Sequence, residues 1–500
     1  MTSPRLVLAL DQGTSSSRAL LFDHDAHIVA QVQRPTTQLY PEPGWVNQDA
    51  MEIWESTLAC AREAMHSAGI EPPDIAAIGI TNQRETLILW DRKTGSPVAP
   101  AIVWQSRQSQ PQVAKLISRG MAAVYQGITG LVPDAYFTAT KIAWLFETQP
   151  ALRMRAAHGE LCAGTVDSWL IWNLTGGGVH ATDVSNASRT MLFDIQRREW
   201  CPALLDDLGI PAEVLPAVMS SSGRLAETRE DLFGTPIPIT GVAGDQQAAL
   251  FGQTGFSPSD TKNTYGTGSF LLMNTGEAPR PSTHQLLTTI AWKIDGALTY
   301  ALEGGVYVSG AAVQWLRDGL HLIDSSSDVE PLAMSVPDSG GVVFVPALTG
   351  LGAPYWDANA RGTIVGLTRG TTDAHLARAT LEAIAFQTRD VTDAMTIDAA
   401  IPLTTLRVDG GAARNNLLLQ IQADVLGVPV IRPTQVETTA LGAAFLAGLG
   451  VGFWPDQEAL RATWEVDRVF EPKWSADERD SRYGTWRRAV DRARNWVIES

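Results

Sequence analysis

Near the N-terminus, the pattern of hydrophobic and polar positions predicts two strands joined by a polar turn. Across residues 7–23 an apolar run ends at Asp11, a Gly and four consecutive hydroxyl residues follow, and a second apolar run begins after Arg18. This order is typical of a β-hairpin. The same pattern returns at residues 261–274, where a Gly/Thr turn again separates two apolar runs. Two such hairpins indicate a duplicated architecture.

The remaining chain alternates between strand and helix patterns. Short apolar runs predict strands at residues 28–33, 75–81, 86–90, 102–104, 237–242, 341–346 and 406–409. Helical spacing of apolar positions predicts helices at residues 49–67, 111–119, 139–147, 308–320, 373–395, 417–426, 437–449 and from Asp477 onward. Strands that alternate with helices, some of them in hairpins, predict α/β domains with mixed sheets. The repeat places a boundary near residue 252, so we expect domains at residues 1–252 and 253–500.

Composition narrows the class of protein. A chain of 500 residues is too long for one core, and its formal net charge of −16 argues against a nucleic-acid partner, whose phosphates it would repel. The three cysteines are widely spaced and predict no disulfide framework. The most apolar stretch, residues 438–455, is shorter than a membrane span and contains four glycines, so we expect a buried helix there and no membrane insertion. The N-terminal residues show no signal-peptide pattern, and together these features predict a soluble, cytoplasmic protein.

The turn of the first hairpin carries groups that suit a phosphate. Backbone N–H groups around Gly13, the hydroxyls of residues 14–17 and the guanidinium of Arg18 can all bind anionic oxygens. Asp11, at the end of the strand, would instead suit a Mg²⁺ ion, which prefers hard oxygen ligands and keeps much of its water. The alternative is an ordinary hairpin whose tip is polar because it is solvated.

Nucleotide binding in this chain would depend on turns other than the familiar phosphate loops. The sequence has no Walker A pattern and no complete GxGxxG after a strand. Residues 409–416 place two glycines where a strand passes into a helix, and there a backbone can approach a flat adenine ring closely. Any one of the three glycine-containing turns could be an ordinary tight turn. Together, and in this order, they resemble the superfamily of actin, sugar kinases and heat-shock chaperones, which implies ATP bound in a cleft between two domains.

A second group of polar residues lies near the ends of predicted strands. Arg84 and Glu85 come just beyond a strand and are flanked by Asn, Gln and Thr, which favours a polar ligand over the alternative, a surface ion pair. Trp104 and Tyr136 would supply apolar walls. Asp245 follows another strand, where a carboxylate could act as a general base or as a helix N-cap, and the two roles are compatible.

Several segments resemble one family. Residues 8–18, 79–86, 164–172, 186–193, 244–252, 263–268 and 348–357 are similar to glycerol kinases, and the resemblance extends to about residue 454 without a large insertion. Asn-Gln-Arg-Glu together with Gly-Asp-Gln-Gln is typical of glycerol kinases within the FGGY family of carbohydrate kinases. The resemblance implies two actin-like, ribonuclease-H-like domains with the active-site cleft between them. It also implies ATP-dependent phosphorylation of glycerol to sn-glycerol 3-phosphate.

The same resemblance implies roles for individual residues. Those expected to hold glycerol are Arg84, Glu85, Trp104, Tyr136, Asp245, Gln246 and Phe270, with Asp245 as the catalytic base. Those expected to contact ATP are Thr14, Ser15, Ser16 and Arg18 in the first turn, and Thr267, Gly310, Gln314, Gly411 and Asn415 in the second half. Asp11 and Asp245 would bind Mg²⁺ directly or through water. The set is chemically coherent, because phosphoryl transfer needs mainly positioning, charge neutralisation and a base.

One loop departs from the family pattern. Many bacterial members have a Gly-rich, Arg-containing loop that binds fructose 1,6-bisphosphate at a tetramer interface. Here residues 231–239 form a shorter loop, and Pro236, which cannot donate to a phosphate, stands in place of the arginine. We therefore expect weak or no inhibition by this sugar bisphosphate. The segment around Pro472 also departs from the family's binding site for a sugar-transport regulatory protein, so that partner is not expected.

Two other functions stay open from sequence alone. Another kinase of the same family would phosphorylate xylulose, ribulose, gluconate or a tetritol, and Arg84 with Glu85 argues against it. A non-catalytic ATP-dependent clamp would bind nucleotide without transferring phosphate, and Asp245 argues against it. For the expected glycerol-kinase-like enzyme, the predicted assembly is a homo-oligomer, a dimer or a tetramer.

Overall fold

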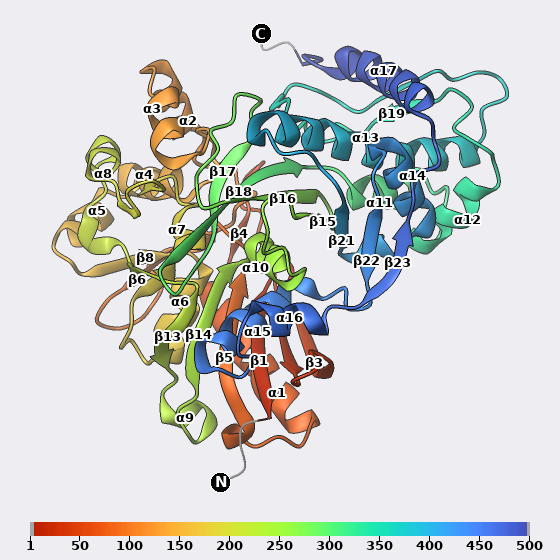
Figure 1. Ribbon diagram of the computed structural model, residues 1–500. Helices are drawn as coiled ribbons and strands as arrows, with labels where there is room; N and C mark the ends of the chain where they lie inside the picture. The colour runs from red at the N-terminus through yellow and green to blue at the C-terminus, as the bar shows by residue number, and fades with distance from the viewer. Residues whose placement is uncertain (1–4, 498–500) are drawn as a thin grey trace.

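The computed structural model describes residues 5–497 and is built around two mixed sheets (Figure 1). The first sheet has the strand order β13-β14-β5-β1-β2-β3. Its strands are β1 (Leu6–Gln12), β2 (Ser16–Phe22), β3 (Ile28–Pro35), β5 (Ile75–Asn82), β13 (Ser222–Glu227) and β14 (Pro238–Gly244). β1 pairs antiparallel with β2, which confirms the first predicted hairpin, and β5 runs parallel to both β1 and β14. The carboxyl ends of β1, β5 and β14 therefore meet at one edge of the sheet, where α/β proteins place their sites.

The second sheet repeats the pairing pattern of the first. Its order is β17-β18-β16-β15-β21-β22-β23. Its strands are β15 (Thr261–Tyr265), β16 (Ser269–Gly276), β17 (Leu287–Ile294), β18 (Ala297–Val306), β21 (Leu406–Asp409), β22 (Val430–Pro433) and β23 (Val466–Phe470). From β18 to β23 the neighbours pair antiparallel, antiparallel, parallel, parallel and antiparallel, as they do from β3 to β13 in the first sheet. The expected duplicated architecture is confirmed at the level of strand topology.

Helices flank both sheets, as predicted. The expected helices are α1 (Ala50–Ser67), α2 (Gln110–Ser118), α4 (Thr138–Thr148), α11 (Gly310–Asp318), α13 (Asp373–Ala399), α14 (Asn416–Leu426), α15 (Thr438–Val451) and α17 (Ala476–Ala493). α1 begins after Asp49, whose side chain accepts a hydrogen bond from the Met51 N–H. The fold is therefore the predicted α/β class, with mixed sheets flanked by helices.

Helix α15 joins the last part of the sequence to the first sheet. It packs on β1, β5 and β14 of the first sheet, as Figure 1 shows, and against α10 (Asp245–Gly252). The contact is a close one, because a Cβ added at Gly442 would lie 1.8 Å from the Ala248 carbonyl oxygen. The apolar stretch near residue 440 is thus a buried, closely packed helix. Among the described residues, no helix combines the length and the apolar character needed to cross a membrane.

The cysteines give a direct test of the packing. Cys60, Cys162 and Cys201 are buried free thiols, and burial raises the pKa of Cys60 and of Cys162 to about 11. Because the thiolate is the reactive form, we expect neither Cys60 nor Cys162 to react with a disulfide reagent in the native protein at about pH 8. Denaturant should make both react. Peptide mapping after brief labelling checks this, and rapid native modification of either residue would contradict the packing described here.

Candidate active site

The predicted site residues converge on two adjoining cavities between the sheets. The first has a volume of about 800 Å³ and is lined in part by Thr14, Ser15, Arg84, Glu85, Trp104, Tyr136, Asp245, Gln246, Thr267 and Phe270. The second has a volume of about 420 Å³ and is lined in part by Thr267, Gly310, Gln314, Gly411 and Asn415. Both cavities are bordered by Gly266 and Thr267, in the turn between β15 and β16. Segments far apart in the sequence therefore form one connected cleft.

Three of the predicted residues do not line either cavity. Asp11 and Arg18 face each other across the first hairpin and form an ion pair, and Arg18 also donates to Glu437 Oε2 at 2.5 Å. The Ser16 hydroxyl accepts a hydrogen bond from Gln33 Nε2 at 3.0 Å. Burial raises the pKa of Asp11 even though Arg18 opposes the shift. In this arrangement the Arg18 guanidinium binds carboxylates, and its expected contact with phosphate stays a prediction.

Asp245 lies at the start of α10, where the carboxyl end of β14 opens onto the larger cavity. The helix N-cap is Gly244, so the interpretation of Asp245 as the N-cap was wrong, and Asp245 is instead the first helical residue. Its Oδ1 accepts from the Gln246 N–H at 2.7 Å and lies 3.1 Å from Arg84 Nε, while 30% of the side chain remains exposed. The surrounding protein raises the pKa of Asp245 by burial, although Arg84 and Lys262 oppose the shift. A carboxylate that is held in place, partly accessible and raised in pKa suits a general base.

Arg84 and Glu85 belong to a buried network of charges. Their side chains are 2% and 1% exposed, which excludes the surface ion pair considered from sequence. Arg84 binds Glu303 through both of its Nη atoms, and Arg189 Nε donates to Glu85 Oε1 at 2.7 Å. Buried charges are stable only when they are paired and hydrogen-bonded, so these contacts account for the burial of the acceptor-side residues.

The backbone at Glu85 is also fixed. Glu85 has a φ of 61°, a left-handed conformation that a residue with a side chain rarely adopts. The Lys141 ammonium donates to the Glu85 carbonyl oxygen at 3.0 Å and also to the Tyr136 carbonyl oxygen. Burial lowers the pKa of Lys141 to about 7. These hydrogen bonds stabilise the left-handed backbone conformation of Glu85, which a glutamate rarely adopts without such support.

Aromatic rings form the apolar wall of the larger cavity. The Trp104 and Tyr136 rings meet edge to face with centroids 5.5 Å apart, and Trp104 meets Phe270 in the same way at 6.1 Å. Trp104 Nε1 donates to the Thr14 hydroxyl at 2.8 Å, which connects this wall to the first hairpin turn. Trp104 and Tyr136 thus line the larger cavity, and their expected contact with a ligand stays a prediction.

Glycine backbone borders the smaller cavity. A Cβ added at Gly411 would meet no atom within 4 Å, so the chain is open to an approaching flat group at this point. Asn415 caps α14, since its side-chain oxygen accepts from the Leu418 N–H at 2.8 Å. Gly310 begins α11 and donates its N–H to the Gly266 carbonyl oxygen at 3.0 Å. The predicted nucleotide residues of the second half of the chain therefore surround one open space, the smaller cavity.

Comparison with known proteins supports one assignment for this architecture. The N-terminal domain of the FGGY family of carbohydrate kinases matches residues 6–252, and the C-terminal domain of the same family matches residues 261–451. The chain belongs to the FGGY family of carbohydrate kinases. This FGGY kinase is 57% identical to glycerol kinase 2 of Thermotoga maritima over 492 residues, covering 98% of this chain and 99% of that protein. It is 58% identical to the glycerol kinase of Halorhodospira halophila over 497 residues, covering 99% and 98%.

Solved structures give the same architecture. The crystal structure of Plasmodium falciparum glycerol kinase with ADP superposes with a TM-score of 0.92 at 36% identity, covering 99% of both chains. A xylulose kinase from Lactobacillus acidophilus superposes with a TM-score of 0.85 at 22% identity, covering 98% of this chain and 96% of that one. The second match supports the fold alone.

The sequence did not reveal several charged residues that contact the predicted site residues of this FGGY kinase. These are Lys141, Arg189, Lys262, Glu303 and Glu437. Lys262 is fully buried, donates to Gln246 Oε1 and Thr264 Oγ1, and has a pKa lowered by burial to about 8. Arg189 lies within the family-like segment at residues 186–193, which was a usable signal. Glu303 had no such sequence signal, because nothing in its neighbours along the chain indicates that it pairs with Arg84.

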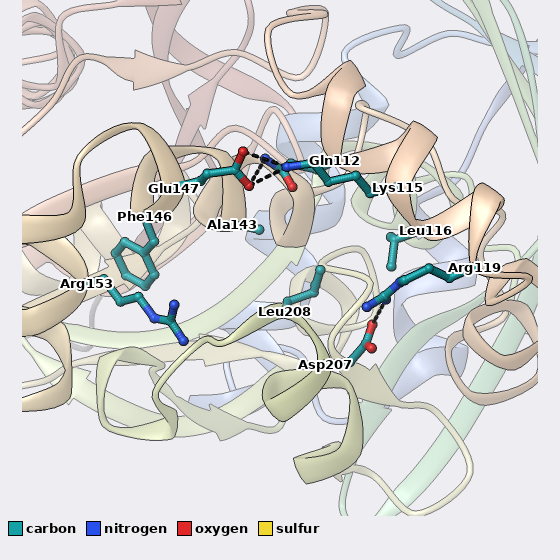
Figure 2. Close-up of a pocket in the computed structure, with 10 residues that line it drawn as sticks. All are labelled: Gln112, Lys115, Leu116, Arg119, Ala143, Phe146, Glu147, Arg153, Asp207 and Leu208. Atoms are coloured by element: carbon teal, nitrogen blue, oxygen red, sulfur yellow. Dashed lines mark hydrogen bonds and ion pairs between the residues drawn. The ribbon is translucent and has the colours of Figure 1, made fainter.

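A separate pocket of about 240 Å³ lies among α2, α4, α5 (Pro150–Ala157) and α8 (Pro202–Leu208), as Figure 2 shows. Two ion pairs line it, Lys115 with Glu147 and Arg119 with Asp207, each at 2.6 Å. None of the predicted site residues borders this pocket. The cleft between the sheets is therefore where the candidate chemistry is concentrated.

Proposed function

We propose that this FGGY kinase transfers the γ-phosphoryl group of ATP to glycerol, with sn-glycerol 3-phosphate as the product. The observation that carries the proposal is the acceptor end of the larger cavity, where Arg84, Glu85 and Asp245 lie beside an aromatic wall. Glycerol is small and fully polar, so it must be recognised mainly by hydrogen bonds. The full-length similarity to glycerol kinases supports the same assignment.

In the proposed reaction Asp245 accepts the proton of the attacking hydroxyl. Its position between Arg84 and the open cavity supports this role. Arg84 and Glu85 would orient the triol, with Gln246 beside them and Trp104, Tyr136 and Phe270 covering its carbon atoms. A site of this kind rejects analogues that lack a hydroxyl, because its buried polar groups would stay unpaired.

ATP is the proposed donor, with its adenine and ribose in the smaller cavity. The residues expected there are Thr267, Gly310, Gln314, Gly411 and Asn415, and the ADP in the Plasmodium glycerol kinase structure supports this use of the fold. The triphosphate would extend past Gly266 and Thr267, which border both cavities, toward Thr14, Ser15, Ser16 and Arg18. Closure of the cleft would exclude water, the competing acceptor.

The carboxylates of Asp11 and Asp245 would hold Mg²⁺, partly through water. They fit such an ion, because both are oxygen donors and lie at the carboxyl ends of β1 and β14, two strands of the same sheet whose carboxyl ends meet at one edge. When bound, Mg²⁺ supplies neutralisation of the phosphate charge that builds up during transfer. The protein side chains do the positioning and accept the proton.

We also infer the wider organisation of the enzyme. The matching strand topology of the two sheets supports domains at residues 1–252 and 253–500. The negative net charge of −16 supports a partner set of glycerol and ATP without nucleic acid. A homo-oligomer and a cytoplasmic location are part of the proposal, and gel filtration with light scattering tests the first.

The product tests the proposed reaction. Incubation with Mg-ATP and glycerol should give a phosphomonoester that an NAD-linked sn-glycerol 3-phosphate dehydrogenase oxidises completely. Complete oxidation would establish both the acceptor and the position of the phosphate. A product that this dehydrogenase leaves untouched would contradict the proposal.

Regulation by fructose 1,6-bisphosphate should be weak or absent. The loop concerned forms the short helix α9 (Glu230–Phe233), in which Leu232 and Phe233 are buried, and Pro236 follows it. This segment presents neither a glycine-rich backbone nor an arginine at position 236 for a sugar bisphosphate. Titration of fructose 1,6-bisphosphate into a rate assay should leave the rate unchanged, whereas strong saturable inhibition would refute the prediction.

A further inference from the structure

We propose that Glu303 is a positioning residue of the acceptor site, which orients Arg84 directly and Glu85 through Arg189. The inference rests on the proposed glycerol kinase function and deepens it. Glu303 belongs to β18 of the second sheet, whereas Arg84 follows β5 of the first. The carboxylate of Glu303, on the second sheet, would thus fix the positions of Arg84 and Glu85, which follow a strand of the first sheet.

Glu303 occupies the two terminal nitrogens of the Arg84 guanidinium. Both Nη atoms of Arg84 donate to Glu303, and the contact from Nη2 to Oε1 is 3.0 Å. Nη1 also reaches Gln247 Oε1 at 3.2 Å. The donors left for a ligand are Nε, 3.1 Å from Asp245, and the remaining Nη2 hydrogen, whose contact with the Tyr136 hydroxyl is a long 3.4 Å. Glu303 therefore decides which edge of Arg84 is available to a substrate hydroxyl.

Arg189 connects Glu303 to Glu85. Its Nη2 donates to Glu303 Oε1 at 2.9 Å and its Nε donates to Glu85 Oε1 at 2.7 Å. The guanidinium is fully buried and lies over the Tyr136 and Phe137 rings, so it has little freedom to turn. Among the described residues, Glu85 Oε2 has no hydrogen-bond partner. One oxygen of Glu85 is thus fixed, and the other remains to accept from a substrate hydroxyl.

The charges of the buried network balance. Arg84, Glu85, Arg189 and Glu303 are each at most 2% exposed in their side chains, and together they carry no net charge. Burial opposes ionisation of Glu303, but Arg189 and Arg84 outweigh it and hold the pKa of Glu303 below its ordinary value. If Glu303 lost its charge, the nearest other carboxylate for Arg84 would be Asp245, already 3.1 Å from Nε. Arg84 would then shift toward the proposed base and lose the orientation in which it meets a substrate hydroxyl.

Glu303→Gln tests this with a nearly isosteric change. The variant should raise the KM for glycerol by about tenfold or more and leave the KM for ATP within about twofold. The reason is the location of the charged network: Arg84 and Glu85 border the acceptor cavity, and no member of the network, which also contains Arg189 and Glu303, lines the nucleotide cavity. Glu382→Gln is the matched control. Glu382 is also a buried glutamate, 2.9 Å from Arg378, and it lies on α13 away from the acceptor network.

The outcomes separate positioning from mere stability. Support would be a glycerol-specific rise in KM for Glu303→Gln, a smaller rise for Glu303→Asp, which keeps the charge, and normal constants for Glu382→Gln. An unchanged KM for glycerol, or equal rises for glycerol and ATP, would overturn the inference. If Glu303→Gln does not fold, Glu303→Asp decides, since a shortened carboxylate should still raise the KM for glycerol selectively. If the unaltered enzyme phosphorylates no glycerol, the proposed function fails first, and that result is distinct from a failure of Glu303 alone.

Discussion

Asp245→Asn should abolish phosphoryl transfer to glycerol while ATP binding persists. We expect kcat to fall by about a thousandfold, within the range of about 10²–10⁴ that a positioned general base contributes. The fold should survive, because the side-chain oxygen of the introduced asparagine could still accept the 2.7 Å hydrogen bond from the Gln246 N–H. The expected pattern is therefore an inactive protein with a normal affinity for ATP, measured by titration calorimetry beside the rate assay.

The control for this experiment is another aspartate that lies away from both cavities. Asp231 pairs with Arg229 at 3.0 Å and its side chain is 69% exposed, so Asp231→Asn should keep normal activity. If Asp245→Asn retained substantial turnover, the base would have to be a different group. If it lost ATP binding as well, Asp245 would act mainly on the nucleotide rather than on the acceptor.

Arg84→Lys should nearly eliminate the use of glycerol even though the positive charge is kept. A lysine ammonium is a point charge and cannot bind Glu303 through two nitrogens while also reaching Gln247 and Asp245. The loss of two charge-assisted hydrogen bonds, at about 1.5 kcal/mol or more each, corresponds to a fall of about a hundredfold or more in kcat/KM for glycerol. Steady-state kinetics with glycerol varied at saturating ATP measures it.

This variant should also unfold at a lower temperature, because Glu303 and Glu85 would be left buried and poorly paired. Arg378→Lys is the matched control, since Arg378 pairs with Glu382 at 2.9 Å outside the acceptor cavity. It should keep normal kcat/KM. A normal kcat/KM for Arg84→Lys would contradict the assignment of Arg84 to the acceptor.

The local pattern of the sequence was enough to predict much of the fold. Both hairpins and the long helix α13 come from strong apolar periodicity between clear turns, and the structure has them within a few residues of the expected limits. The location of the candidate site followed in part, because turns at strand ends gather at one edge of a sheet. Most of its individual residues were expected only from the resemblance to glycerol kinases. The strands β17 and β18 were missed. β18 contains two consecutive glycines and a glutamate at residues 303–305, which hide the strand pattern although most of its residues are buried.

What could not be predicted are contacts between distant parts of the chain. Glu303 is 219 residues from Arg84, and no local pattern indicates that they pair. The same holds for Arg18 and Glu437, which are 419 residues apart. Arg18 was expected at phosphate because of its neighbours in the turn, and only the tertiary structure reveals that carboxylates compete for it. The functional roles of the individual site residues stay predictions for the experiments above.

The most direct test of the central claim is ADP release, followed optically, with Mg-ATP and a panel of acceptors. The panel should contain glycerol, xylulose, ribulose, gluconate and a tetritol. We expect glycerol to give a far higher kcat/KM than any other acceptor. Turnover with a larger sugar alone would keep the family but overturn the roles given to Arg84 and Glu85, and no turnover with any acceptor would contradict the kinase assignment itself.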